Sequence, residues 1–317
     1  METQKITQCK LMRFILFGLL VIAAVVGWHV YEYLKNGREE CNHETTFVRD
    51  IVELSRNLYD LEAQTGVKLL DKVDYQGRTT LHSRDDQAQF PLFQRIHGTV
   101  SLNESATIYL LTRLYDNYAL DSNFSEKFSA EKKQKELDLL LAILKTPIMR
   151  RTMKFLHSKA AVNADDDDAQ LRLLQDIWFT QYSRGGREVG SSGFEHVFLA
   201  ELKAGSVLGL HNWIYFREQE RKGNLEYRKL IALVELDKQH LAAVRFKFHN
   251  IIKPYNTIFV GTSPELEMSL YTVCFVLNSD RPCPIELGHS ELIIATHSLN
   301  WMGKQVIAAA YPSIKLG

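Results

Sequence analysis

Apolar residues recur at intervals of three and four along the first half of the chain, a spacing that predicts helices. The pattern covers residues 51–59, 106–119, 131–144, 149–159 and 170–182. Pro147 predicts the end of one helix or the start of the next. Four aspartates at 165–168 precede the last of these helices, so we expect a solvated loop whose negative charge favours the start of that helix.

The pattern changes after residue 184, where glycine becomes frequent and strand-like apolar runs dominate. Strands are predicted at 197–202, 207–210, 230–236, 242–248, 257–260, 271–277, 291–296 and 306–311. Helices are predicted between them at 213–222 and 265–270. We therefore predict an α+β fold, with a mainly helical subdomain at 47–184 followed by an antiparallel β-rich subdomain at 185–317.

An apolar run without Asp, Glu, Lys or Arg lies near the amino end, at 14–31. It matches the roughly 17–25 residues that a bilayer span needs, and a buried helix is rarely so apolar on all sides. Two interpretations compete, an uncleaved transmembrane signal-anchor and a cleaved signal peptide. Three of the four charged residues at 1–13 are basic, and this excess of positive charge predicts that the segment lies in the cytosol. A polar linker is predicted at 32–46.

Either interpretation exports the rest of the chain, as a single-pass type II membrane protein or a secreted one. Asn103 and Asn123 begin glycosylation sequons, which fit export. Cys274 and Cys283 flank a turn-like stretch, so two strands joined there would bring their sulfurs into bonding range. The alternative is two buried free thiols. Cys41 is then free or links two chains.

Composition narrows the class of protein. Hydrophobic residues make up 45% and charged residues 24%, which is ordinary for a globular protein and excludes a collagen-like fibre or a multi-span membrane protein. The chain has 38 Lys+Arg and 38 Asp+Glu, which excludes a uniformly basic surface. The charge is not balanced everywhere, however. Between residues 200 and 260 there are ten Lys or Arg and only six Asp or Glu, so this segment is positively charged.

Two histidines carry the candidate chemistry. A β-hairpin that turns at Lys203-Ala204 would put His196 opposite His211, and a turn at Ala204-Gly205 would leave them diagonal on one face. Paired imidazoles suit general acid–base catalysis, metal binding with a third ligand, or a merely structural role. The absence of H-E-x-x-H, C-x-x-C and G-x-S-x-G motifs disfavours a metalloprotease and a serine hydrolase.

The residues around this pair resemble a known family. The two histidine-containing stretches are similar to the signature of the EndoU (XendoU-like, poly(U)-specific) endoribonucleases, and so are several stretches after them. They are 193–198 and 209–213, followed by 214–216, 220–224, 253–254 and 258–267. Stretches at 114–118, 144–149 and 176–179 match the helical portion of that family. The cysteine pair also resembles one found in its animal members. The resemblance covers roughly residues 47–315.

The resemblance implies a reaction on single-stranded RNA at uridines. The ribose 2′-OH attacks the adjacent phosphorus and leaves a 2′,3′-cyclic phosphate, so DNA is not cut. By position, His196 and His211 take the acid and base roles, in either order, and Lys253 stabilises the transition-state charge. The family is activated by Mn²⁺ or Ca²⁺, and the sequence identifies no metal ligands. We expect a monomer.

Further residues match positions that support the family's site. Glu195 and Glu201 match acidic positions, although on a strand they would face away from His196; they are otherwise ordinary surface glutamates. Asn212 either orients His211 or serves as a turn residue.

One stretch departs from the family pattern. The family has a basic residue followed by Thr-Tyr, which help to hold the uracil. Here Thr296 is kept, but Ala295 replaces the basic residue and His297 replaces the tyrosine, with Ser298 next to it as a residue that could share the recognition role. The departure puts uridine preference in doubt. The departure motivates an alternative, a catalytically weak or inactive RNA-binding protein of the same fold. A third hypothesis is an extracellular adhesion or scaffold protein.

Overall fold

The computed structural model describes residues 46–64, 72–77, 88–94, 105–126, 129–185 and 187–314. A compact unit extends from Ile51 to Gly317. The predicted tail and apolar segment at 1–31, together with Cys41 and Asn103, lie outside the described residues. Within the ranges that are described, no helix is long and apolar enough to span a bilayer.

Helices dominate the first part of the described chain. Residues 46–64 are helical, and α2 (Ala106–Thr112), α3 (Ala130–Leu144), α4 (Pro147–Ser158) and α5 (Asp167–Leu174) follow. A 3₁₀ turn at Tyr115–Asn117 and a π-helical turn at Gln175–Phe179 extend two of them. Side chains that accept a backbone N–H cap the amino ends of α2 to α5, and these are Ser105, Ser129, Thr146 and Asp166. The acidic run therefore begins α5, as predicted.

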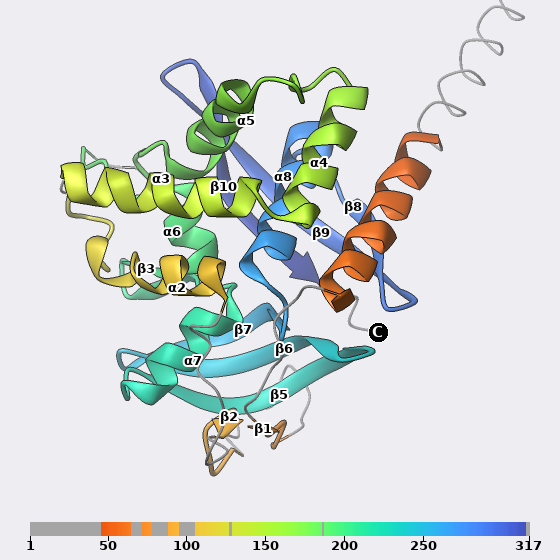
Figure 1. The fold of residues 1–317 in the computed structure, drawn as a ribbon. Coiled ribbons are helices and arrows are strands. Elements are labelled where there is room, and N and C mark those ends of the chain that lie inside the picture. The colour runs from red at the N-terminus through yellow and green to blue at the C-terminus, as the bar shows by residue number, and fades with distance from the viewer. Residues whose placement is uncertain are drawn as a thin grey trace, which may run out of the picture. The chain divides into compact units, whose positions relative to one another are not determined.

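Antiparallel strands dominate the second part and form two three-stranded sheets (Figure 1). One sheet has the order β5–β6–β7, made of Leu225–Leu236, Gln239–Phe248 and Ile251–Val260. The other has the order β10–β9–β8, made of Lys304–Ser313, Ser290–Trp301 and Cys283–Leu287. Two small pairs are β1 (Lys72–Val73) with β2 (Phe93–Gln94), and β3 (Ala200–Lys203) with β4 (Ser206–Gly209). The mixture of helices and antiparallel sheets confirms the α+β class.

Three helices lie among these strands and join the two parts of the fold. They are α6 (Gly193–Phe198), α7 (Trp213–Arg221) and α8 (Pro264–Asn278). α8 packs between α4 and β9, and α6 packs against β10. A buried hydrogen bond of 3.0 Å from Trp178 Nε1 to Thr272 Oγ1 ties the π-helical turn to α8. The helical and β-rich parts thus share buried contacts.

Two of the predicted strands are wrong. Residues 271–277 belong to α8, and 197–202 begins with the last residues of α6 before β3 starts at Ala200. α8 is buried on nearly every side, so its sequence lacks the polar positions that would reveal a helical period. The reliable signal was Ser263-Pro264, a capping serine followed by proline in the first turn.

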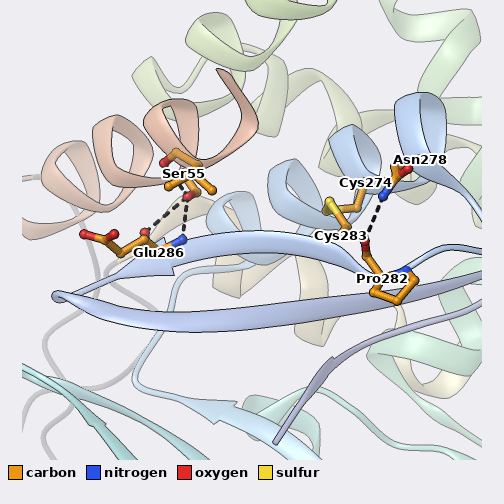
Figure 2. Close-up of a disulfide and its surroundings, with 7 residues drawn as sticks. Ser55, Cys274, Asn278, Pro282, Cys283 and Glu286 are labelled. Atoms are coloured by element: carbon orange, nitrogen blue, oxygen red, sulfur yellow. Dashed lines mark hydrogen bonds between the residues drawn. A yellow bond between two sulfur atoms is a disulfide. The ribbon is translucent and has the colours of Figure 1, made fainter. Parts of the chain in front are cut away.

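The disulfide joins the end of α8 to the start of β8, rather than two strands (Figure 2). Cys274 and Cys283 have Cα atoms 5.7 Å apart. Asn278 Nδ2 donates to the Pro282 carbonyl at 2.9 Å and closes the loop between the cysteines. Toward the other end of β8, Ser55 Oγ accepts from Glu286 N at 2.8 Å, which attaches the first helix to this sheet.

Candidate active site

The short helix α6 carries His196 in its last turn. Ser192 caps the helix, because its Oγ accepts from Glu195 N at 3.2 Å. In return Ser192 Oγ donates to Glu195 Oε2 at 2.6 Å, so cap and third residue support each other. This reciprocal cap stabilises a helix at Gly193–Phe198, although the apolar run from residue 197 had suggested a strand.

The hairpin β3–β4 returns the chain to α6. Its turn lies at Ala204-Gly205, with φ values of +48° and +74°, and pairs Lys203 with Ser206. This is one of the two predicted turns. Two positive φ values in a two-residue loop suit the right-handed twist of the strands.

Past β4, the backbone bonds directly to α6. Leu210 N donates to His196 O at 3.1 Å, and His211 N donates to Val197 O at 3.0 Å. Gly209 makes this approach possible, because it has φ +67° and a Cβ there would lie 1.8 Å from His196 O. Any side chain at position 209 would therefore separate the two segments.

The result is that the two imidazoles meet. The His196 and His211 ring centroids are 5.8 Å apart, and the residues are 8% and 7% exposed. The predicted convergence is present, but its predicted cause is corrected, since His196 is on a helix and His211 follows β4. The backbone hydrogen bonds, and not a shared strand face, bring the rings together.

His196 is held by a buried carboxylate. Its Nδ1 lies 3.0 Å from Glu201 Oε2, and Arg184 Nε donates to the same oxygen at 2.8 Å. The expectation that Glu201 faces away from His196 is wrong, because the carboxylate reaches back from β3 to the end of α6. A carboxylate at Nδ1 favours the tautomer that has its proton there, and leaves Nε2 for a substrate.

His211 is held by a backbone carbonyl of β7 instead. Its Nδ1 lies 3.0 Å from Thr257 O, so the proton again sits on Nδ1. On the same strand, Asn256 Nδ2 donates to Leu210 O at 2.8 Å, and Lys253 Nζ donates to Gly209 O. β7 therefore supplies the lysine and also fixes the segment that carries His211.

Burial and neighbouring charges set the protonation of all three groups. Burial lowers the pKa of His196 to about 4, although the hydrogen bond to Glu201 opposes this shift. The pKa of His211 is lowered well below its usual value by burial and by the nearby Lys253, and only a neutral carbonyl opposes the shift. Burial also lowers the pKa of Lys253 to about 7. The three groups thus titrate close to neutral pH or below it.

Comparison with known proteins gives the family. The family model for endoribonuclease XendoU matches residues 50–312. The chain belongs to the XendoU family. It is 44% identical to the uridylate-specific endoribonuclease EndoU of Drosophila melanogaster, over 96% of this chain and 93% of that protein. It is 30% identical to the poly(U)-specific endoribonuclease-A of Xenopus laevis, over 88% of this chain and 96% of that protein.

A solved structure of the XendoU family has the same fold. It is the structure of XendoU, described as a splicing independent snoRNA processing endoribonuclease, with a TM-score of 0.69 and 29% identity. The match covers 83% of this chain and 95% of that chain. The similarity therefore includes both the helical and the β-rich parts.

The remaining acidic candidate, Glu195, lies behind the site. Its residue is 1% exposed, and Oε2 accepts from Ser192 Oγ and from Gln181 Nε2 at 3.1 Å. Burial raises its pKa well above the usual value. Glu195 thus stabilises the start of α6 and does not contact the imidazole as Glu201 does.

The three predicted substrate-binding residues on β9 do not converge on one place. Thr296 is 1% exposed and faces the interior, while Ser298 Oγ donates to Asp280 Oδ2 at 2.5 Å in the loop before β8. His297 is exposed, and its Nε2 lies 3.2 Å from the hydroxyl of Tyr311 on β10. The Tyr311 ring in turn stacks on His211, with centroids 4.9 Å apart and planes at 21°.

Four contributors to this site were missed by the sequence analysis. They are Arg184, Asn256, the carbonyl of Thr257, and Tyr311. None of them has a motif of its own, and a backbone carbonyl carries no sequence signal at all. Tyr311 comes beside His211 through the packing of β10 against α6 and β7, where Thr257 Oγ1 donates to the carbonyl of Pro312.

The same residues lack a full set of metal ligands. In the part of the chain that the structure describes, no three His, Cys, Asp or Glu side chains are placed to hold an ion. The oxygen of Glu201 that points toward His196 already accepts two hydrogen bonds. With no third ligand beside them among the described residues, the two imidazoles do not fit a resident cation.

A second buried carboxylate supports His211 through its neighbour. Asn212 caps α7, with Oδ1 accepting from Ile214 N and Tyr215 N, and its Nδ2 lies 3.3 Å from Glu267 Oε1. Thr262 Oγ1 donates to the same oxygen at 2.7 Å. Asn212 is therefore a cap residue held in one orientation by Glu267. Burial raises the pKa of Glu267 to about 8.

The Glu267→Gln variant should have a flatter dependence of stability on pH. With a pKa raised from 4.5 to about 8, the folded state binds more protons than the unfolded chain in that interval, so stability falls as pH rises through it. Glutamine keeps the acceptor but cannot ionise. Between pH 5 and 8 the variant should gain on the order of a few kcal/mol relative to the wild type, measured as the free energy of unfolding.

Glu53→Gln, at an exposed glutamate of the first helix, is the matched control and should leave the slope unchanged. Identical slopes in wild type and Glu267→Gln would contradict the buried, protonated state of Glu267.

Proposed function

We propose that this protein cuts single-stranded RNA at uridines and leaves 2′,3′-cyclic phosphate ends. The observation that carries the proposal is the meeting of His196 and His211, each held at Nδ1, beside Lys253. The relatives of this chain in the XendoU family include uridylate-specific and poly(U)-specific endoribonucleases. Two imidazoles and a cation are what a 2′-OH transesterification requires.

We propose different roles for the two histidines, because their environments differ. His211 is bound to a neutral carbonyl and lies near Lys253, so it stays neutral and suits the base that takes the proton from the 2′-OH. His196 is bound to Glu201, whose charge favours the imidazolium, so it suits the acid that protonates the leaving 5′-oxygen. A bound phosphate adds negative charge and raises the pKa of both rings.

Lys253 is the electrostatic group of the proposed reaction. Its pKa of about 7 in the free protein rises when an anionic phosphate binds, so the ammonium form is favoured when the substrate is present. The attack by the 2′-OH gives the phosphorus an extra negative charge, and a fixed ammonium stabilises that charge more in the transition state than in the substrate. DNA lacks the attacking group and is not cut.

We propose that the protein acts as a monomer. The family implies a divalent cation, Mn²⁺ or Ca²⁺, and we propose that any such ion acts outside the three-residue centre. Both ions should be supplied in turn in every assay.

His211→Ala should abolish cleavage of a uridine-rich oligonucleotide by the purified folded domain. Loss of one proton-transfer group costs roughly 10²–10⁴-fold in rate. The product of the wild type should be a 2′,3′-cyclic phosphate, identified by mass. His289→Ala, at an exposed turn between β8 and β9, should cut at the wild-type rate. Normal cutting by His211→Ala would sink the assignment, and tight RNA binding without any product would favour the non-catalytic alternative.

We propose that Tyr311 provides the surface on which the base stacks. The ring lies against His211 and is only partly buried, and His297 reaches its hydroxyl from the neighbouring strand. A tyrosine therefore occupies the site even though position 297 is a histidine. This supports a uridine preference despite the histidine at position 297.

Tyr311→Ala should raise KM for a uridine dinucleotide by about 5- to 150-fold, the equivalent of the 1–3 kcal/mol that a stacked base contributes. Tyr311→Phe should retain most of the affinity, because the ring remains. An unchanged KM in Tyr311→Ala, with folding verified by circular dichroism, would place the base elsewhere.

We also propose that the apolar segment at 14–31 exports the folded domain, as a type II membrane protein or a secreted one. Asn123 is exposed in a turn and available for glycosylation, and Asn103 is a second sequon. Enzymatic removal of N-glycans should increase the gel mobility of the wild type from cells, but not that of Asn103→Gln/Asn123→Gln. No shift in the wild type would contradict export. Sequencing the amino terminus of the mature protein distinguishes an anchor from a cleaved peptide.

A further inference from the structure

α4 presents a row of cations to solvent. Arg150, Arg151 and Lys154 are exposed and recur at helical spacing, and Lys145 is exposed just before the helix. The opposite side of α4 is buried and contacts α8 and α3. These four residues are called the α4 basic face below. Their heads point away from the core because the buried positions of α4 alternate with them.

The α4 basic face has no acidic residue near it in sequence. From 139 to 164 the chain contains no Asp and no Glu. Across the described residues, none of the four cations forms an ion pair or a side-chain hydrogen bond. Ion pairs are common elsewhere on this neutral protein, including Arg172 with Asp166, Arg221 with Glu218 and Lys304 with Asp176. Uncompensated charge is thus concentrated at one place.

We infer that the α4 basic face is a second contact surface for the RNA backbone, separate from the histidine centre. This inference rests on the proposed function, because it extends the binding of the same substrate. Clustered Lys and Arg attract phosphates without regard to base sequence, and release of counterions gives such contacts a strong salt dependence. The surface would hold parts of a long RNA that lie outside the scissile dinucleotide.

The chemistry of the face favours RNA over an anionic membrane. A helix that lies on a lipid surface pairs its cations with exposed aromatic or large aliphatic side chains. On α4, the large apolar residues Ile148, Met149 and Leu156 are buried in the core and do not lie beside the exposed cations. Among the described residues, the exposed large apolar side chains lie on other elements.

The test is the triple variant Arg150→Gln/Arg151→Gln/Lys154→Gln. Glutamine is a good helix former, and all three positions are exposed, so the fold should be kept. Affinity is measured in the inactive His211→Ala background with a ladder of oligonucleotides of increasing length, each with one uridine. For long RNA the triple variant should bind on the order of tenfold more weakly, and the slope of log K against log salt should fall by about 2.

Short substrates separate this inference from the proposed function. In the active background, the triple variant should cut a uridine dinucleotide at the wild-type rate, because a dinucleotide has no phosphate besides the scissile one. If the wild type fails to cut it, the proposed function fails. If the wild type cuts it and the triple variant binds long RNA with unchanged affinity and salt slope, only the α4 inference fails.

The matched control removes the same charge from elsewhere. Arg172→Gln/Arg221→Gln/Lys304→Gln lowers the net charge equally, but each of its residues is paired with a carboxylate. It should leave the RNA affinity and slope close to wild type. An equal loss in both triple variants would show a general charge effect and overturn the inference. Loss of binding to phosphatidylserine vesicles with unchanged RNA binding would also overturn it.

Discussion

The site depends on two backbone hydrogen bonds that join α6 to the segment after β4. Leu210 N and His211 N donate to the carbonyls of His196 and Val197, and they bring two imidazoles from different elements to 5.8 Å. Gly209 permits the approach, because a side chain there would strike the carbonyl of His196. Backbone bonds between short elements are less adaptable than side-chain contacts, so the spacing of the rings is built into the fold.

Two strands from the sheets hold this contact in place and add further site residues. β7 fixes the segment by the Asn256 side chain and the Thr257 carbonyl, and it also carries Lys253. β10 lies against α6 and brings Tyr311 beside His211. Each imidazole has one nitrogen occupied and one left for substrate, and the two partners differ in charge. That difference, a carboxylate for His196 and a carbonyl for His211, gives similar residues different proton affinities.

The sequence was sufficient for much of this arrangement but not for its causes. The helical period predicted α3 and α4 well, and strand-like apolar runs predicted β5, β6, β9 and β10. α8 was mistaken for a strand over half its length, because a helix buried all round shows no period. The hairpin turn at Ala204-Gly205 was one of the two that were predicted, yet the helical state of His196 depends on the cap that Ser192 forms with Glu195.

The site residues divide in the same way. The family resemblance located His196, His211 and Lys253, and strand alternation then led to the wrong orientation for Glu201. Strand alternation fails there because His196 is not on the strand. Tyr311 and Arg184 were missed because they reach the site only through tertiary packing, which no local pattern encodes. The same packing explains why His297 beside Tyr311 does not leave the site without a tyrosine.

Different hydrogen-bond partners give the two histidines unequal proton affinities. This inequality can be measured by NMR titration of the two imidazoles in the free protein, with Glu201→Gln as the second sample. Both rings should titrate below the usual histidine pKa, His196 should take up its proton at a higher pH than His211, and Glu201→Gln should lower the pKa of His196 alone. A His211 pKa above that of His196, or a His196 pKa indifferent to Glu201, would contradict this explanation.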